Sequence, residues 1–175
     1  MLSSCATLNQ IFSPTKDQNP KISKIDSTEI VQDFTMKGKF VIYIKNKGFS
    51  GSLLWSSYGE EDIIKIFSPF NSMIATIKLN NINEQIKFEL SDNDKRANTK
   101  KFLNKIFIEE KNIFTLRSLL INPPSTLRQK NKVDIAMNKW KIELENLYDN
   151  KRIPKKMKFK KDDISLKIVV TKWMD

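Results

Sequence analysis

Hydrophobic and polar residues alternate with a period of two over most of the chain from Met36 onward. This period puts every second side chain on the same face of a β-strand. The first two runs predict long antiparallel strands that are joined near Asn46-Lys47-Gly48. Further strands are expected over residues 62–67, 73–79, 84–90, 140–145, 156–160 and 164–171. The predicted sheet therefore has one hydrophobic face and one polar face.

The hydrophobic face of this sheet must be covered or curled upon itself, because an open apolar surface of that size would aggregate. Residues 97–107 carry Phe102 and Phe107 on a stripe with helical spacing, and residues 114–121 predict a second, shorter helix that ends at Asn122-Pro123-Pro124. We expect both helices to lie across the concave side of the sheet. The pattern alone is compatible with a filled core or with a cavity for an apolar ligand.

The N-terminal part of the chain differs in composition from the rest. Residues 6–26 are polar, contain two prolines and show no periodic hydrophobic pattern, which predicts a flexible tether. A short helix with a polar cap is expected over residues 27–34. We therefore divide the chain into a tether over residues 1–25 and a single domain over residues 26–175, because a chain of this length is typical of one domain.

Composition excludes several kinds of site. The chain has no histidine, one cysteine and four glycines. It therefore lacks the commonest metal ligand and cannot form an internal disulfide or a cysteine-based zinc site. Four glycines do not assemble a dinucleotide fingerprint or a P-loop. We expect no cofactor, no metal and no catalytic residue, and predict that the protein is not an enzyme.

The formal net charge of +11 at pH 7 comes almost entirely from lysine, since only four of the 31 basic residues are arginine. Specific phosphate and base recognition relies on the forked guanidinium group. We interpret most of the charge as a solvated surface, with weak attraction to anionic lipid or to an acidic partner. Binding of single-stranded nucleic acid is an alternative, but the pattern places the aromatic residues on the inward face.

The only cysteine, Cys5, directly follows Leu2-Ser3-Ser4. A branched apolar residue three places before a cysteine, with small residues between them, is typical of the lipobox of bacterial lipoproteins. The motif predicts lipidation of Cys5 and anchoring of the chain in a membrane, and the alternatives are a chance match or a free thiol. A secretory signal needs a basic region and an apolar stretch before the cleavage site, so this prediction requires residues upstream of Met1.

Several short motifs, taken in order, resemble the family of the outer-membrane lipoprotein receptor LolB. They are Lys37-Gly38-Lys39-Phe40-Val41, Phe49-Ser50-Gly51-Ser52-Leu53-Leu54-Trp55, Phe67-Ser68-Pro69-Phe70-Asn71-Ser72, and the strand that starts at Trp140 together with the closing strand that ends in Trp173. The resemblance covers residues 34–173. It implies a mainly β fold with an α lid, in which an antiparallel, unclosed half β-barrel encloses a hydrophobic cavity and is covered by short helices.

The resemblance also implies a function and partners. Members of this family are membrane-anchored receptors that accept triacylated lipoproteins from the periplasmic carrier LolA and insert them into the inner leaflet of the bacterial outer membrane. We therefore expect a monomer that is lipid-anchored in the outer membrane and faces the periplasm, with a LolA-like carrier and acylated cargo as partners. A lipid-binding module for another amphiphile and a structural lipoprotein with a filled core are the alternatives.

Individual residues receive roles from the same resemblance. The family's protruding loop falls on Ser68-Pro69-Phe70-Asn71, and its apolar tip, which is associated with membrane insertion, falls on Phe70. The pattern without the resemblance favours Phe70 in the core. Arg117 matches the arginine of the lid motif. The residues expected to line or close the acyl cavity are Trp55, Phe102, Phe107, Arg117, Leu119, Trp140 and Trp173.

The lid region departs from the family's pattern in three ways. Leu119 stands where tryptophan is usual, and Ser125 stands where glycine usually follows the lid's proline. Between Pro124 and Trp140 the chain is shorter than is typical, which predicts that much of a strand is missing there.

Overall fold

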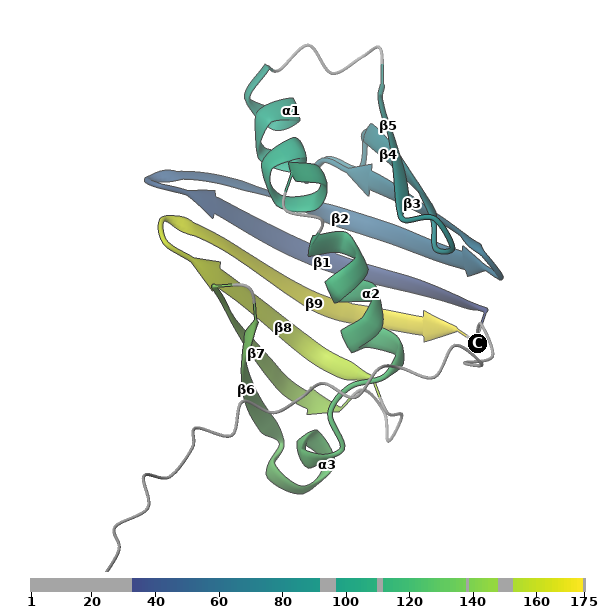
Figure 1. Ribbon diagram of the computed structural model, residues 1–175. Helices are drawn as coiled ribbons and strands as arrows, with labels where there is room; N and C mark the ends of the chain where they lie inside the picture. The colour runs from purple at the N-terminus through teal and green to yellow at the C-terminus, as the bar shows by residue number, and fades with distance from the viewer. Residues whose placement is uncertain (1–32, 92–96, 110–111, 138, 148–152, 175) are drawn as a thin grey trace, which may run out of the picture. The chain divides into compact units, whose positions relative to one another are not determined.

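A nine-stranded antiparallel β-sheet forms the body of the protein, as the computed structural model in Figure 1 shows. The structure describes residues 33–91, 97–109, 112–137, 139–147 and 153–174. The strands in chain order are β1 (Phe34–Ile44), β2 (Lys47–Tyr58), β3 (Glu61–Phe67), β4 (Met73–Asn80), β5 (Gln85–Leu90), β6 (Lys132–Met137), β7 (Trp140–Leu147), β8 (Pro154–Lys161) and β9 (Ile164–Met174). Their order in space is β5-β4-β3-β2-β1-β9-β8-β7-β6. Of these described strands, β5 and β6 each pair on one side only, which confirms the predicted unclosed half-barrel.

Alternation along the strands separates the two faces of the sheet. In β1, Met36, Phe40 and Ile42 are buried, whereas Lys37 and Lys39 are exposed. Burial of one such hydrophobic side chain contributes roughly 1.5–3 kcal/mol. A slip of one residue would turn the whole hydrophobic set toward water, so the buried face fixes the register of each strand. The predicted hydrophobic and polar faces are confirmed.

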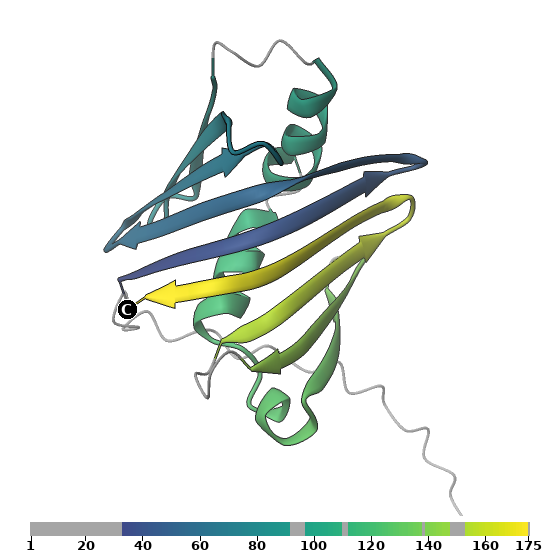
Figure 2. The same cartoon turned by 180° about the vertical axis from the view of Figure 1, so that it is seen from behind.

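Helices cover the hydrophobic face of the sheet, and Figures 1 and 2 show α1 and α2 on the same side of it. The helices are α1 (Ala97–Leu103), its continuation as the π-helical turn η1 (Asn104–Glu109), α2 (Asn112–Ile121) and α3 (Thr126–Lys130). Their buried side chains join those of the strands in one hydrophobic cluster: Phe102, Leu103, Ile106, Phe107, Ile113, Leu116, Leu120 and Leu127. The predicted helical cover is confirmed.

Two predictions near the start of the domain need correction. The helix expected over residues 27–34 lies mostly outside the described residues, and its last residue, Phe34, begins β1 instead. Phe34 pairs with Ser57 of β2 because this register buries its ring in the sheet's hydrophobic face. The turn between β1 and β2 falls on Lys45-Asn46, one residue before the predicted position, and Lys45 adopts a positive φ of 55°.

The prediction that much of a strand is missing between Pro124 and Trp140 is wrong. This segment contains α3 and the six-residue strand β6. Val133, Ile135 and Met137 pack against the hydrophobic core, while the residues between them are exposed. The period of two is therefore present in this segment, and the shortening leaves room for the strand.

Several turns gather at one end of the sheet, which we call the loop end. Ile44 pairs with Lys47 and with Ile164, so the β1–β2 and β8–β9 turns lie next to each other there. The backbone N–H of Lys45 donates to the carbonyl oxygen of Asp163 at 2.8 Å. The start of β7 reaches the same end. The β3–β4 turn, residues 68–72, points the same way but lies nearer the middle of the sheet, because Phe67 pairs with Ser52 and Ser52 pairs with Lys39. At the opposite end the chain enters β1 and leaves β9.

Candidate functional site

The carboxylate of Asp62, at the inward position of β3, is completely buried and accepts four side-chain hydrogen bonds. One oxygen accepts from the Trp55 indole at 2.8 Å and from the Arg117 Nε at 2.9 Å. The other accepts from the Ser57 hydroxyl at 2.7 Å and from the Asn81 amide at 2.9 Å. A buried carboxylate without partners would be strongly unfavourable, so Asp62 depends on these donors.

Arg117 connects this buried carboxylate to the helical cover. It belongs to α2, its side chain is 16% exposed, and a second guanidinium nitrogen lies 3.3 Å from the Ser57 hydroxyl. Hydrogen bonds between a guanidinium and a carboxylate are shorter and stronger than those between neutral groups. The Arg117–Asp62 pair therefore ties α2 to β3 from inside the protein.

Aromatic side chains form two groups on the hydrophobic face. Near the end where the chain enters, Phe34 stacks on Trp173 with ring centroids 4.6 Å apart and lies 6.0 Å from the Trp55 ring. Near the loop end, Phe102 of α1 stacks on Phe49 with centroids 6.3 Å apart. Both groups lie between the helices and the sheet, where such ring pairs add to the stability that burial supplies.

The β3–β4 turn is a tight, hydrogen-bonded loop. The buried Ser68 hydroxyl accepts from the backbone N–H groups of Phe70 and Ser72, each at 3.2 Å. The N–H of Ser68 donates to the carbonyl oxygen of Ser72 at 2.9 Å, and Asn71 adopts a positive φ of 62°. Asparagine tolerates this left-handed conformation better than most residues. Pro69 and Phe70 are consequently held at the outer corner of a fixed turn.

Phe70 is the most exposed large hydrophobic residue of the described chain, with 90% of its surface accessible. The alternative that it packs in the core is therefore wrong. Leaving a phenylalanine in water forgoes a few kcal/mol of burial energy, and the neighbouring Met73 is also exposed, at 45%. A rigid turn that presents these side chains to solvent is suited to contact with lipid or protein.

Residues 32–173 match the family model described as Outer membrane lipoprotein LolB. The chain belongs to the LolB family. No curated protein matches it. LolB proteins act in the localisation of lipoproteins to the outer membrane, together with LolA and lipoprotein cargo, and the family is one of transport proteins rather than enzymes.

The residues that the resemblance to LolB assigned to the acyl cavity and lid lie in two places. Trp55 and Arg117 donate to the Asp62 carboxylate and Trp173 stacks on Phe34 near the entry end, whereas Phe102 and Trp140 lie toward the loop end. The hydrophobic members are buried in the core cluster or packed against it: Trp55, Phe102, Phe107, Leu119, Trp140 and Trp173. Their role in acyl binding, like the insertion role of Pro69 and Phe70, stays a prediction, and Cys5 lies outside the described residues.

Asp62 and Ser57 are site residues that the sequence reasoning missed. A signal for Asp62 was present, because it shares the inward face of β3 with Ile64 and Ile66. A carboxylate on a hydrophobic face requires a buried donor, and Arg117 is the basic residue of the predicted lid stripe. The sequence of this LolB chain therefore contained enough information to predict that Asp62 pairs with Arg117.

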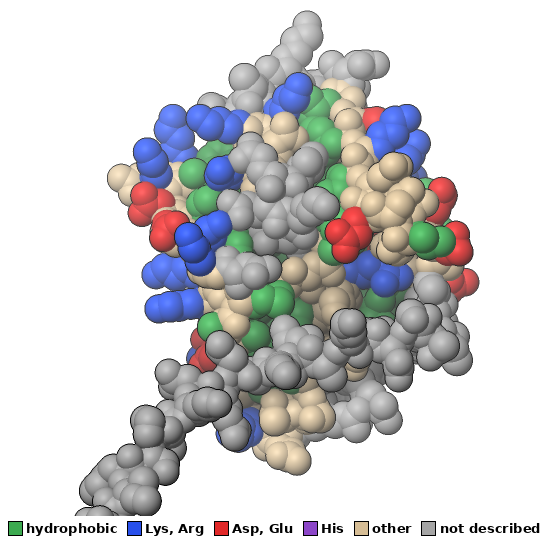
Figure 3. Space-filling view, viewed as in Figure 1, with side chains coloured by type: hydrophobic (Ala, Val, Ile, Leu, Met, Phe, Trp, Pro, Cys, Tyr) green, Lys and Arg blue, Asp and Glu red, His purple; other side chains and the backbone are tan. Residues whose placement is uncertain are grey.

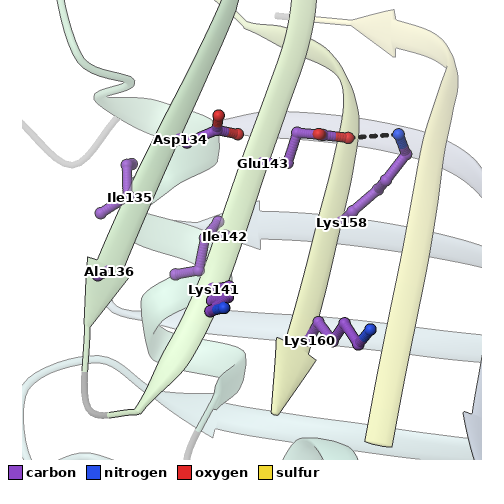
Figure 4. Close-up of a pocket in the computed structure, with 8 residues that line it drawn as sticks. All are labelled: Asp134, Ile135, Ala136, Lys141, Ile142, Glu143, Lys158 and Lys160. Atoms are coloured by element: carbon purple, nitrogen blue, oxygen red, sulfur yellow. Dashed lines mark hydrogen bonds and ion pairs between the residues drawn. The ribbon is translucent and has the colours of Figure 1, made fainter.

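Two pockets open on the surface of the described residues. One, of about 400 Å³, lies at the loop end between the β1–β2 turn and α1 and is lined by Ile44, Lys45, Asn46, Lys47, Lys101 and Phe102. The other, of about 530 Å³, lies on β6, β7 and β8, where Glu143 forms an ion pair with Lys158 (Figure 4). Hydrogen bonds from Lys132 and Lys158 lower the pKa of Glu143 to about 2.

The described residues of this LolB protein lack two kinds of feature. They contain no helix that is both long and apolar enough to cross a membrane. They also contain no group of three or more carboxylate, thiol or imidazole side chains suited to holding a metal ion.

Proposed function

We propose that this protein accepts triacylated lipoproteins from a LolA-like carrier and inserts them into the inner leaflet of the outer membrane, to which Cys5 anchors it as a monomer facing the periplasm. The observation that carries this proposal is the exposure of Phe70 on a turn that is fixed by the Ser68 hydroxyl. An aromatic side chain held outside the fold in this way can enter the acyl region of a bilayer.

The hydrophobic face of the sheet supplies the binding surface for the acyl chains. In the structure the side chains of α1 and α2 occupy this face, and they bury Trp55 completely. Acyl chains therefore bind when the two helices move away and the chains take their place. Because the sheet is held by its own ladder of strand pairs, the helices can leave without separating the strands.

Transfer energies explain why such a receptor is needed. Burial of an acyl chain contributes roughly 0.8 kcal/mol per CH₂, and two chains already anchor a protein stably. Three chains therefore do not cross water unaided. Delivery without an energy source requires that affinity for the chains rises from carrier to receptor and again from receptor to bilayer.

The position of the anchor is compatible with insertion by Phe70. Cys5 is separated from Asp33 by 27 residues, which span up to about 90 Å when extended. The eleven residues of β1, which run from the entry end toward the loop end, span about 35 Å. The loop end, and the β3–β4 turn that lies closer to the entry end, can therefore both reach the membrane in which Cys5 is anchored.

A transfer assay with purified carrier, acylated cargo and vesicles tests the proposal. With Phe70→Glu we expect cargo to leave the carrier at the normal rate but to accumulate on the receptor, because a carboxylate at the tip opposes entry into lipid. Ile82→Glu is the matched control, since Ile82 is 67% exposed on the β4–β5 turn at the opposite end. Normal insertion by the Phe70→Glu variant would disprove the role of the tip, and failure of the wild-type chain to accept cargo would disprove the function.

A further inference from the structure

Lysine side chains gather at the loop end, where the ring of Tyr43 is about half exposed. In Figure 3, basic and hydrophobic side chains lie next to each other on the left of the molecule, where Figure 1 places the β1–β2 turn. The described turns of this end, the strand residues beside them and α1 carry Lys45, Lys47, Lys100, Lys101, Lys139, Lys160 and Lys161, against the acidic residues Asp162 and Asp163. The loop end therefore has an excess of positive charge.

Three of these lysines line the 400 Å³ pocket. Lys45 and Lys47 come from the β1–β2 turn, and Lys101 comes from α1 on the other side of the opening. Each is exposed, and within the part of the chain that the structure describes none of them takes part in an ion pair with a side chain. The hydrophobic part of the lining comes from Ile44 and Phe102. The pocket thus combines an apolar floor with three ammonium groups at its rim.

We propose that this pocket binds the headgroup of an anionic phospholipid, such as phosphatidylglycerol, in the membrane that the loop end contacts. The three ammonium groups attract the negatively charged phosphate, and the first acyl carbons of the same lipid lie on Ile44 and Phe102. The inference rests on the proposed function in one respect, namely that the loop end faces the bilayer. It adds that the receptor distinguishes membranes by their anionic lipid content.

The surroundings of the pocket favour a membrane over a free anion or a nucleic acid. Tyr43, which lies at this end, is 52% exposed and is suited to the interface of a bilayer, and lysines near it bind anionic headgroups. Single-stranded nucleic acid requires aromatic faces along a groove for stacking, whereas Phe102, the pocket's aromatic residue, is only 8% exposed. The negative charge of Asp162 and Asp163 lies on the adjacent β8–β9 turn and does not line the pocket.

Vesicle co-sedimentation of the whole chain with Cys5→Ser, which carries no lipid anchor, tests this proposal directly. Vesicles of pure phosphatidylcholine are compared with vesicles that contain 30% phosphatidylglycerol, a composition chosen as roughly that of an anionic bacterial membrane. The triple variant Lys45→Gln, Lys47→Gln, Lys101→Gln should lose on the order of 100-fold in affinity for the anionic vesicles. A control triple of equal charge change, Lys37→Gln, Lys39→Gln, Lys172→Gln, alters exposed lysines of β1 and β9 away from the loop end and should lose much less.

Each outcome supports or overturns the proposal. A loss of affinity for anionic vesicles that is confined to the Lys45, Lys47, Lys101 triple variant supports the pocket as the lipid site. Equal losses in both triples would show attraction by net charge alone, and equal binding to both kinds of vesicle would show that no anionic headgroup is recognised. If a stoichiometric amount of single-stranded oligonucleotide displaced the protein from anionic vesicles, nucleic acid would be the ligand of the pocket and the lipid proposal would be wrong. Cargo acceptance from the carrier in solution is measured separately, so its failure would overturn the proposed function without changing the vesicle result.

Discussion

The guanidinium of Arg117 on α2 lies 2.9 Å from the buried carboxylate of Asp62 on β3. This contact joins the helical cover to the sheet across 55 positions of sequence. Helix α2 cannot move away from the hydrophobic face without separating the two charges. The Arg117–Asp62 pair therefore sets part of the free energy needed to expose the proposed acyl-binding surface.

Removal of one member of this pair should destabilise the fold. Arg117→Met leaves the Asp62 carboxylate buried with only neutral donors, and breaking a buried pair in this way costs about 3 kcal/mol. Urea denaturation followed by tryptophan fluorescence measures the loss. Lys87→Met, which removes an exposed ion pair with Glu89, is the control and should change the free energy of unfolding by less than about 1 kcal/mol. A loss in Arg117→Met no greater than in this control would show that the pair carries little energy.

Replacement of both members should restore much of the lost stability. In Arg117→Met with Asp62→Asn no charge remains buried, and the amide oxygen can still accept a hydrogen bond from a buried donor such as the Trp55 indole. We expect the double variant to recover at least about 2 kcal/mol of unfolding free energy relative to Arg117→Met. The double variant should also accept acylated cargo more readily than the wild type, since no charge separation opposes movement of α2. Unchanged or slower acceptance by a folded double variant would argue against α2 as a moving lid.

The Glu143 carboxylate gives the fold a defined acid sensitivity. Hydrogen bonds from Lys132 and Lys158 lower the pKa of Glu143 from 4.5 to about 2. A lowered folded-state pKa contributes stability above the unfolded value, and this contribution is lost as pH falls from about 4.5 to about 2. We expect the thermal midpoint of Glu143→Gln to lie below that of the wild type at pH 7 and the two curves to converge near pH 2. If the thermal midpoints of the two proteins differed by the same amount over this whole pH range, the lowered pKa of Glu143 would be contradicted.

Alkaline pH should act on the same cluster through Lys158. Glu143, followed by Glu145, raises the pKa of Lys158 above its ordinary value of 10.5. A raised folded-state pKa contributes stability that is complete below 10.5 and is lost at higher pH. In Lys158→Met the fall in thermal midpoint above pH 10.5 should therefore be shallower than in the wild type. Lys65→Met, on the outward face of β3 and away from this cluster, serves as the control and should keep the wild-type slope.

The length of the segment between Cys5 and Asp33 should limit insertion of cargo into the membrane, but it should not limit binding of cargo to the receptor. Deletion of residues 9–32 leaves three residues between Cys5 and Asp33, which span up to about 14 Å. The β3–β4 turn begins level with Lys39, about 20 Å along β1 from Asp33. We expect the anchored deletion variant to accept cargo and to fail in its insertion into the same vesicle. Replacement of the deleted residues by a Gly-Ser segment of equal length should restore insertion. Full insertion by the deletion variant would exclude the proposed geometry.

Local periodicity predicted most of the fold because each strand buries one face. Met36, Phe40 and Ile42 determine the face and register of β1 without any knowledge of the neighbouring strands. The Asp62 network was not predicted, because its members lie on β2, β3, the β4–β5 turn and α2. Periodicity within one element carries no information about contacts between elements. The missed strand β6 is short and has only partly buried hydrophobic residues, so its pattern was weak.

The exposed position of Phe70 also could not be read from periodicity. Its neighbours Phe67 and Met73 belong to strands, and a phenylalanine between two strands is usually buried. The Ser68 hydroxyl decides the outcome, because it binds the N–H groups of both Phe70 and Ser72 and closes the turn beneath them. Only the resemblance to the LolB family pointed to this loop.

The sheet, as far as the structure describes it, is open along the outer edges of β5 and β6, which do not pair with each other. We call this opening the seam. Among the described strands these two have no hydrogen bonds to each other, so the curvature of the sheet can increase or relax without the loss of a single backbone ladder. A closed barrel has a circumference fixed by its strand number and stagger. Its interior would therefore fit acyl groups of one size. A sheet with a seam can instead adjust its width to acyl groups of different bulk, and the breadth of cargo that this receptor handles would then be set by how far β5 and β6 move apart.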